Sequence, residues 1–320
     1  MTNSVLRPTT PIVAGLRGAL VPLLVGLLLA GCGSGDSDSG PDDTAASNVV
    51  PDSVVQQHVA AARERLTQTD GGERVLRAIE AHGGLSAWYR APTSSYVWEY
   101  ANQGADLHFA SFLVVDNRSR RAYHDLLRTG PYEDPQPVDA AFAWTGDRAW
   151  VAPPDIEQPN PRFWALSGFY FQQIPFVFAD PGINYEALPD ASIDGTPHDM
   201  VRITFGDDVG DAPDDVYTLY LDKESGQVDA IRYAVTYGRD VGPDADLQET
   251  FFDYQDYVTV DGLTVPTRFE GYSYSDDEGI GDSLRNWARA DSISYRRSFD
   301  ESQLTPPDTA RFVSLPGAED

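Results

Sequence analysis

The sequence contains one cysteine and one lysine among its 320 residues, and it lacks the short motifs that mark common enzyme sites. A single cysteine excludes an internal disulfide. There is no Gly-x-Ser-x-Gly elbow, phosphate-binding loop, His-Glu-x-x-His or Cys-x-x-Cys. Gly84-Leu-Ser86-Ala-Trp88 comes closest to the first motif and departs from it at the last position. We therefore predict no catalytic residues and a protein that is not an enzyme.

Positive charge is scarce as well. The chain has 23 Lys and Arg residues against 50 Asp and Glu residues, which gives a formal net charge of −27 at pH 7. Nucleic acid and anionic lipid head groups are poor partners for such a chain, so no nucleic-acid partner is predicted. An acidic, lysine-poor composition suits salty surroundings, because screening over about 8 Å or less weakens self-repulsion. We interpret the charge first as an adaptation to the environment.

No apolar run is long enough to cross a bilayer as a helix. The longest, residues 19–30, follows two arginines and ends at Leu29-Ala30-Gly31-Cys32. A basic start, about a dozen apolar residues and small residues before the cut are typical of a secretory signal. The tetrapeptide resembles the lipobox of bacterial lipoproteins, in which the chain is cut before the cysteine and the sulfur receives a diacylglycerol. We expect residues 1–31 to be a signal peptide and Cys32 to be the site of lipid attachment.

Residues 32–48 are expected to link this lipid to the folded part of the chain. Beyond Cys32 they hold no side chain larger than Asp or Asn, which predicts a flexible tether with a reach of roughly 20 to 24 Å. Acyl chains contribute about 0.8 kcal/mol per buried methylene, so the membrane is a permanent partner. Gly33 differs from the Asp that favours inner-membrane retention in bacterial lipoproteins. The expected location is the cell envelope, on the outer membrane facing the periplasm.

The remaining residues, 49–320, are predicted to form one domain and a monomer. Apolar side chains alternate in residues 216–221 and 228–237, and the loop between them ends in Gly226, as in a hairpin. A second hairpin is predicted at Asp261-Gly262, which tolerates both left-handed positions of a type I′ turn. Pro266 lacks the N–H that a ladder requires, so it belongs at an edge, a bulge or a curved position. We expect a bent antiparallel sheet.

The N-terminal half of this domain begins with helical patterns and continues with strands. An amphipathic helix is predicted for residues 51–66, and a second for about 72–82, ended by Gly83-Gly84. One further turn carries Trp88. Period-two patterns and short polar breaks then predict another meander, over residues 95–100, 107–115, 120–127, 142–145 and 148–152.

The most aromatic window, residues 159–180, lies between the two meanders and has no charge between Arg162 and Asp180. We expect one or two short helices that cover the mouth of the sheet, with an ordinary core helix as an equal alternative. Eleven further aromatic residues fall between residues 217 and 274. Such a face lines a core more often than it lines a hydrophobic ligand cavity.

Four segments of the sequence are residues 81–88, 145–150, 178–185 and 204–210. Together they resemble a family of bacterial outer-membrane lipoproteins related to the lipoprotein-carrier (LolA/LolB-like) superfamily, and the similarity covers about residues 72–300. The resemblance implies a mainly β (α+β) fold: an incomplete, strongly curved antiparallel β-barrel with N-terminal helices and a central helical insert on its concave side. Some members of the superfamily hold acyl chains there. No acyl-binding residue of the carriers can be matched to a position here.

The leading functional hypothesis is a membrane-anchored lipoprotein that binds a lipid or acyl chain in this half-open barrel, without catalysis. Each methylene buried in the cavity would contribute about 0.8 kcal/mol. The alternatives are a periplasmic sensor or interaction module that recognises a protein or peptide, and an enzyme acting on an envelope substrate. The predicted cavity walls are Trp88, Trp164, Phe169, Phe176 and Phe178.

Few other residues are candidates for a site. His82 ends a helix, where capping of carbonyls is a commoner role than acid or base chemistry. His124-Asp125 and His198-Asp199 are adjacent in strands, which directs the two side chains of each pair to opposite faces.

The acidic loop at residues 207–215 offers oxygen ligands of the kind that Ca²⁺ takes in sets of six to eight. It predicts a weak calcium site, with a solvated hairpin loop as the alternative and no other cofactor expected. The candidate ligands are Asp207, Asp208, Asp211 and Asp214.

Overall fold

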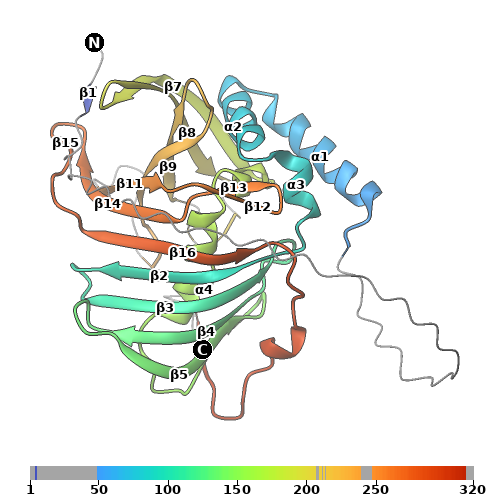
Figure 1. Ribbon diagram of the computed structural model, residues 1–320, viewed down its shortest axis with the longest axis vertical. Helices are drawn as coiled ribbons and strands as arrows, with labels where there is room; N and C mark the ends of the chain where they lie inside the picture. The colour runs from blue at the N-terminus through green and yellow to red at the C-terminus, as the bar shows by residue number, and fades with distance from the viewer. Residues whose placement is uncertain are drawn as a thin grey trace, which may run out of the picture. The chain divides into compact units, whose positions relative to one another are not determined.

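One large sheet dominates the computed structural model, which describes residues 4–5, 49–206, 209–210, 212, 214–238 and 247–314. It contains fifteen strands (Figure 1). These are β1 (Ser4–Val5), β2 (Thr93–Asn102), β3 (Leu107–Asp116), β4 (Ala122–Gly130), β5 (Gln136–Trp144), β6 (Ala149–Ala152), β7 (Ile183–Ile193), β8 (Thr196–Phe205), β9 (Val216–Asp222), β10 (Val228–Ala234), β11 (Glu249–Gln255), β14 (Arg268–Ser275), β15 (Gly279–Ile280), β16 (Asn286–Ser294) and β17 (Arg311–Val313).

The strand order shows that the sheet is open. It runs β1-β7-β8-β9-β10-β11-β14-β16-β2-β3-β4-β5-β6-β17, with β15 beside β14, and the two ends do not pair. Every pair is antiparallel except β1 with β7. Neighbouring strands twist relative to one another, so a sheet of this width curls toward a barrel. The predicted fold class, an incomplete antiparallel barrel, is confirmed.

Helices occupy two places around the sheet. The N-terminal group is α1 (Asp52–Leu66), α2 (Asp70–Ala81) and α3 (Gly84–Arg90), of which α2 packs on β7 and β8. The central group is α4 (Pro161–Gln172) and the 3₁₀ helix η1 (Phe176–Ala179), and α4 contacts β4, β5 and β6. Figure 1 shows α4 inside the curve of the sheet. A short 3₁₀ helix, η2 (Glu301–Leu304), precedes β17.

The first predicted hairpin is present as β9 and β10. Gly226 closes its turn with a φ of 79°, and the Asp222 carboxylate accepts hydrogen bonds from the backbone N–H groups of Glu224 and Ser225. A left-handed position of this kind favours glycine because it has no Cβ. The second strand ends at Ala234, three residues earlier than its apolar pattern predicts.

The second hairpin forms at Asp261-Gly262, where both residues have positive φ, as a type I′ turn requires. Each of its long strands is nevertheless divided. Asp256, with a φ of 55°, separates β11 from β12 (Val258–Val260), and Pro266 separates β13 (Leu263–Val265) from β14. Strands β12 and β13 form a separate two-stranded sheet, while β11 and β14 stay in the main one. Pro266 therefore lies at a bend, as its missing N–H predicts.

The joint between α2 and α3 depends on glycine. Gly83 and Gly84 have φ values of 116° and 89°, which ends α2 where the sequence predicts. A Cβ added to Gly83 would lie 2.1 Å from the carbonyl oxygen of Gly262. The close approach brings the end of α2 against the β12–β13 hairpin.

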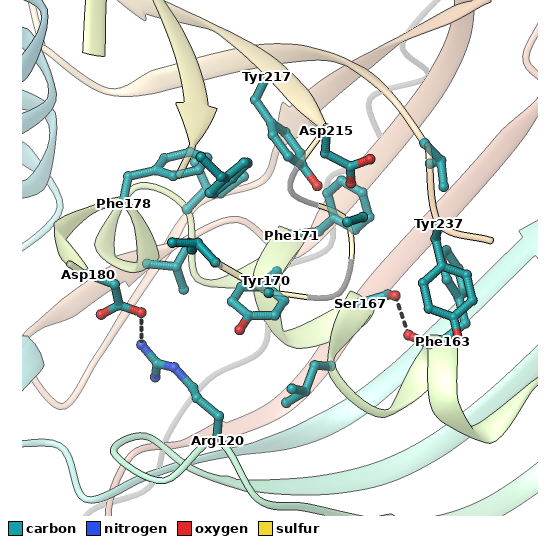
Figure 2. Close-up of a pocket in the computed structure, with 18 of the residues that line it drawn as sticks. Arg120, Phe163, Ser167, Tyr170, Phe171, Phe178, Asp180, Asp215, Tyr217 and Tyr237 are labelled. Carbon is teal, nitrogen blue, oxygen red and sulfur yellow. Dashed lines mark hydrogen bonds and ion pairs between the residues drawn. The ribbon is translucent and has the colours of Figure 1, made fainter. Parts of the chain in front are cut away.

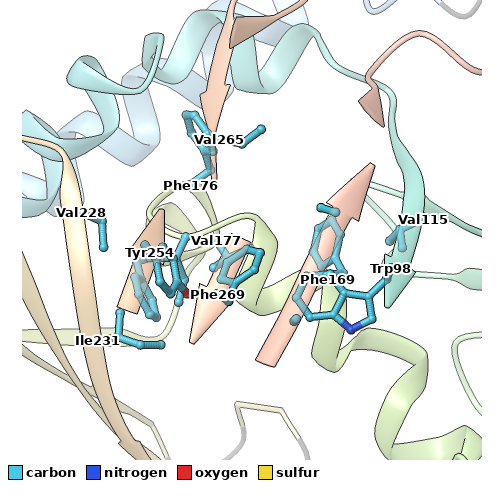
Figure 3. Packing of buried hydrophobic residues seen from close by; sticks show 14 of the residues in the cluster. Trp98, Val115, Phe169, Phe176, Val177, Val228, Ile231, Tyr254, Val265 and Phe269 are labelled. Carbon is cyan, nitrogen blue, oxygen red and sulfur yellow. The ribbon is translucent and has the colours of Figure 1, made fainter. Parts of the chain in front are cut away.

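The core lies between the inner face of the sheet and the central helices (Figure 3). Trp98, Phe169 and Phe269 are almost fully buried there, and the rings of Trp98 and Phe269 meet edge to face at 5.2 Å. Gly168 lets α4 come close, because a Cβ at this position would lie 3.0 Å from the Trp98 ring. Burial of each such ring contributes about 1.5 to 3 kcal/mol.

Candidate functional site

A partly open cavity of about 360 Å³ lies beside α4, on the inner side of β7 to β10. Both faces of α4 carry apolar side chains, so one face can pack in the core while the other borders the cavity. The side chain of Asn160 caps the helix by accepting hydrogen bonds from the N–H groups of Arg162 and Phe163. Trp164, Ala165, Gly168, Phe169 and Gln172, at helical spacing, are buried in the core.

The other face of α4 borders the cavity (Figure 2). Phe163, Leu166 and Tyr170 recur at the i, i+3 and i+7 positions of one helical stripe. Besides the Tyr170 hydroxyl, the polar side chains of α4 at the cavity are Ser167 and the buried Arg162, whose guanidinium lies 3.7 Å from the centre of the Trp144 ring. Apolar side chains of the strands complete the wall, namely Trp144, Ile183, Phe205 and Tyr217, together with Val235 just after β10.

The predicted wall residues fall in different places. Phe178 lines this cavity, and Trp164 borders a second cavity of about 390 Å³. Trp88, Phe169 and Phe176 line neither cavity. They form a buried group in which Trp88 stacks on Phe176 with 5.1 Å between ring centres. Their contribution to the protein is core packing, and ligand contact by these three rings stays a prediction.

The two cavities meet at one pair of aromatic rings. Phe163 and Tyr237 border both, and their ring centres lie 5.1 Å apart. Sequence reasoning did not select these residues, nor Leu166, Tyr170 and Phe171. Helical periodicity counted from Asn160 would have separated the cavity stripe from the core stripe of the aromatic window.

Charged groups at the cavity have partners within the protein. Arg120 pairs with Asp180 at 2.5 Å (Figure 2). The Arg120 guanidinium lies 5.0 Å from the centre of the Phe169 ring. Asp215 accepts hydrogen bonds from the N–H and the hydroxyl of Thr236, at 2.8 and 2.7 Å. Burial raises the pKa of the Asp215 carboxyl. A ligand here would meet mostly apolar surface and a few satisfied polar groups.

Two buried histidines fasten helices to the sheet outside the cavity. His82 donates from Nδ1 to the carbonyl of Thr264 at 2.7 Å and accepts from the N–H of Val228 at Nε2. His124 donates from Nε2 to the carbonyl of Ala165 in α4 and accepts the Ser111 hydroxyl at Nδ1, both at 3.0 Å. Burial lowers the pKa of both rings to about 4. Both are neutral at pH 7, with every ring nitrogen engaged.

The ring contacts of His82 and His198 differ from helix capping and from pairing with an adjacent Asp. His82 is the C-cap residue of α2, yet its ring bonds a strand carbonyl rather than the carbonyls of its own helix. Neither adjacent pair forms a dyad, as expected. His198 bonds Asp229, and its neighbour Asp199 pairs with Arg77 at 2.6 Å.

Several predictions concern residues that are only partly described. Asp207, Asp208 and Asp211 lie outside the described residues, and Asp214 is exposed in a turn before β9. The calcium site therefore stays a prediction. Cys32 and the tether also lie outside the described residues. Within the part of the chain that is described, no helix has the length and apolar character needed to cross a membrane.

Comparison with known proteins finds similarity at the level of structure. Neither the protein-family profiles nor the curated sequences compared with this chain match it. A LolA superfamily protein from Nitrosomonas europaea is 12% identical, with a TM-score of 0.46 over 74% of this chain and 98% of that one. A DUF1329 family protein from Desulfovibrio piger is 12% identical, with a TM-score of 0.45 over 79% and 97%.

A third structure, a putative outer membrane lipoprotein-sorting protein domain from Vibrio parahaemolyticus, is 10% identical, with a TM-score of 0.35 over 78% of this chain and 97% of that one. The solved structures similar to this chain therefore include one described as a LolA superfamily protein.

Proposed function

We propose that this protein is a non-enzymatic, lipid-anchored protein of the cell envelope that binds a lipid or acyl chain in the cavity beside α4. The observation that carries this proposal is the second apolar stripe of α4. Phe163, Leu166 and Tyr170 face a cavity of about 360 Å³ while the opposite face of the same helix is buried in the core. Cavities that bind small molecules measure about 300 to 1,000 Å³ and are lined mainly by apolar side chains.

Burial supplies the affinity in this proposal. Ten methylenes moved from water into the cavity would contribute about 8 kcal/mol, from about 0.8 kcal/mol each. Association itself costs at least about 4 kcal/mol, so the ligand needs most of this burial. Arg120 and Asp180 neutralise one another at the border of the cavity, and Asp215 is bonded to Thr236. The protein therefore recognises the shape and length of an apolar chain, with little contribution from new hydrogen bonds.

Substitution of Leu166 by Trp tests this function. The larger ring would occupy part of the cavity, so we expect the affinity for a fluorescent fatty acid to fall at least about tenfold, the equivalent of 1.4 kcal/mol. Fluorescence titration of the chain lacking residues 1–48 measures this effect. Leu127→Trp is the matched control, because Leu127 is 40% exposed on β4 and does not line the cavity.

The control variant should bind the probe within about twofold of the parent chain. Equal affinity in the parent chain and in L166W, with both folded, would place the ligand elsewhere. A parent chain that binds no fatty acid and instead captures a peptide would support the sensor hypothesis.

A further inference from the structure

A cluster of side chains that could hold a metal ion lies on the face of the sheet opposite the ligand cavity. His198 in β8, Asp222 at the end of β9 and Asp229 in β10 each place one ligand atom within 4.8 Å of the others. His198 is fully buried, while both carboxylates are partly exposed. The imidazole Nε2 and Oδ2 of Asp229 are 2.8 Å apart. Imidazole and carboxylate are the ligands that Zn²⁺ takes in proteins besides thiolate.

The sheet register brings two of these residues together. His198 and Asp222 are directly paired across β8 and β9. Met200 and Tyr220, two residues away on the same strands, belong to a small hydrophobic cluster separate from the main core. Because side chains at i and i+2 share a face, His198 and Asp222 point away from the main core and from the ligand cavity.

A β-bulge brings the third residue to the same face. The pairing of β10 with β9 shifts between Val228 and Ala230, which leaves Asp229 as the extra residue. Val228 and Ile231 are both in the main core, whereas Ala230 belongs to the cluster on the other face. Regular alternation would turn residue 229 inward with Ile231. The bulge turns it outward to His198 instead, and bulges often re-aim a side chain in this way beside functional sites.

The surroundings match a doubly charged cation. An imidazole binds a metal ion in its uncharged form, so with two carboxylates the three ligands would supply two negative charges. The nearby Lys223 directs its ammonium group to Asp190 and to Asp199, at 3.4 Å from the latter, rather than into the cluster. Asp222 is held by backbone N–H groups of its own turn, which fixes one of its oxygens and orients the other. Tetrahedral Zn²⁺ needs donor atoms about 3.3 Å apart, which small side-chain rotations can reach from the present spacing.

We propose that His198, Asp222 and Asp229 form a binding site for a divalent transition-metal cation of the Zn²⁺ type, with water completing the coordination. Coordination by Nε2 places the ring proton on Nδ1. That atom has no hydrogen-bond partner among the described residues. Loss of such an outer partner weakens metal binding by about 10- to 100-fold, so we expect a micromolar rather than a nanomolar dissociation constant.

Calorimetric titration of the full chain with Zn²⁺, and with Co²⁺ as a coloured substitute, tests the site. We expect saturable binding of about one ion per chain, and Co²⁺ absorption bands typical of nitrogen and oxygen ligands. D229N and D222N should each weaken binding at least tenfold. Both positions are partly exposed, so both variants should keep the circular dichroism spectrum of the parent chain.

D190N is the matched control, since Asp190 is a carboxylate of the neighbouring β7 that pairs with Lys223 and lies outside the cluster. Its affinity should equal that of the parent chain, which excludes general attraction to an acidic surface. The proposal would be overturned by the absence of saturable binding below about 100 µM. It would also be overturned if D229N, D222N and D190N bound Zn²⁺ equally well, since the ion would then sit elsewhere.

Discussion

The free energy of unfolding is expected to fall by about 6 kcal/mol as the pH is lowered from 6.5 to 4, because of His82 and His124. Burial holds the pKa of each ring at about 4, against 6.5 for an exposed histidine. Between these values the unfolded chain binds two protons that the folded chain does not. Stability therefore rises with pH across this window and is lost as the pH falls through it. Each ring contributes about 3 kcal/mol, from about 1.4 kcal/mol per pH unit.

Urea unfolding at several pH values between 5 and 7 measures this slope, above the range in which most carboxylates titrate. In H124Q one titrating ring is removed, and the Gln amide keeps a donor that can face the Ala165 carbonyl. We expect the slope to fall to about half that of the parent chain. An unchanged slope in H124Q would mean that the His124 ring is accessible to protons in the folded state.

Phe169→Ala is expected to lower the free energy of unfolding by about 3 to 5 kcal/mol, the usual cost of removing a fully buried aromatic ring. The Phe169 ring lies between Trp88, at 6.4 Å between ring centres, and the guanidinium of Arg120. Its loss opens a hole between α4 and the sheet that neither neighbour can fill. Urea unfolding of the parent chain and the variant gives the difference.

Phe312→Ala is the matched control, because that ring is 47% exposed, and it should cost less than about 1 kcal/mol. At low temperature, where F169A remains folded, its affinity for the fluorescent fatty acid should stay within about threefold of that of the parent chain. A stable F169A that no longer binds the fatty acid would mean that this ring contacts the ligand, as the sequence suggested, and that the cavity extends through the core.

Much of the fold could be predicted from local sequence. Gly226 and Asp261-Gly262 occupy the left-handed turn positions that their residue types favour, and both hairpins form there. Local sequence did not predict that the second hairpin would split into the pairs β12–β13 and β11–β14, which lie in separate sheets. Asp256 adopts a positive φ, and the β12–β13 hairpin packs against the end of α2 through hydrogen bonds between His82 and Thr264 and the close approach of Gly83 to Gly262, which are contacts between segments far apart in the sequence.

The sequence identified the segment that borders the cavity, but it did not show which side chains of that segment face the cavity. The aromatic window of residues 159–180 does border the cavity. Aromatic character alone did not separate Phe178, which lines it, from Phe169 and Phe176, which fill the core, because both faces of α4 are apolar. The strand residues of the wall precede this window, as Trp144 does, or follow it, as Ile183, Phe205 and Tyr217 do, and only the sheet order brings them to α4.

The outer His198 cluster lay beyond sequence reasoning for a different reason. Asp229 is 31 residues from His198 and would face the core in a regular strand. Nothing in the alternation of Val228 to Tyr233 marks a bulge, because Val228 is itself a buried apolar residue. The adjacent Asp199 is no partner of His198, as its position in the strand predicts, and it pairs with Arg77 and Lys223 instead.

The central claim is that an apolar chain occupies the cavity beside α4. Photo-crosslinking with a fatty acid that carries a diazirine near its methyl end, followed by mass spectrometry of the digested protein, tests it most directly. We predict saturable labelling of the cavity stripe of α4 and of the wall near Phe178 and Tyr217. Unlabelled fatty acid should suppress this labelling, and L166W should reduce it. Labelling confined to exposed residues such as Leu127 and Val258, with no suppression by competitor, would contradict the claim.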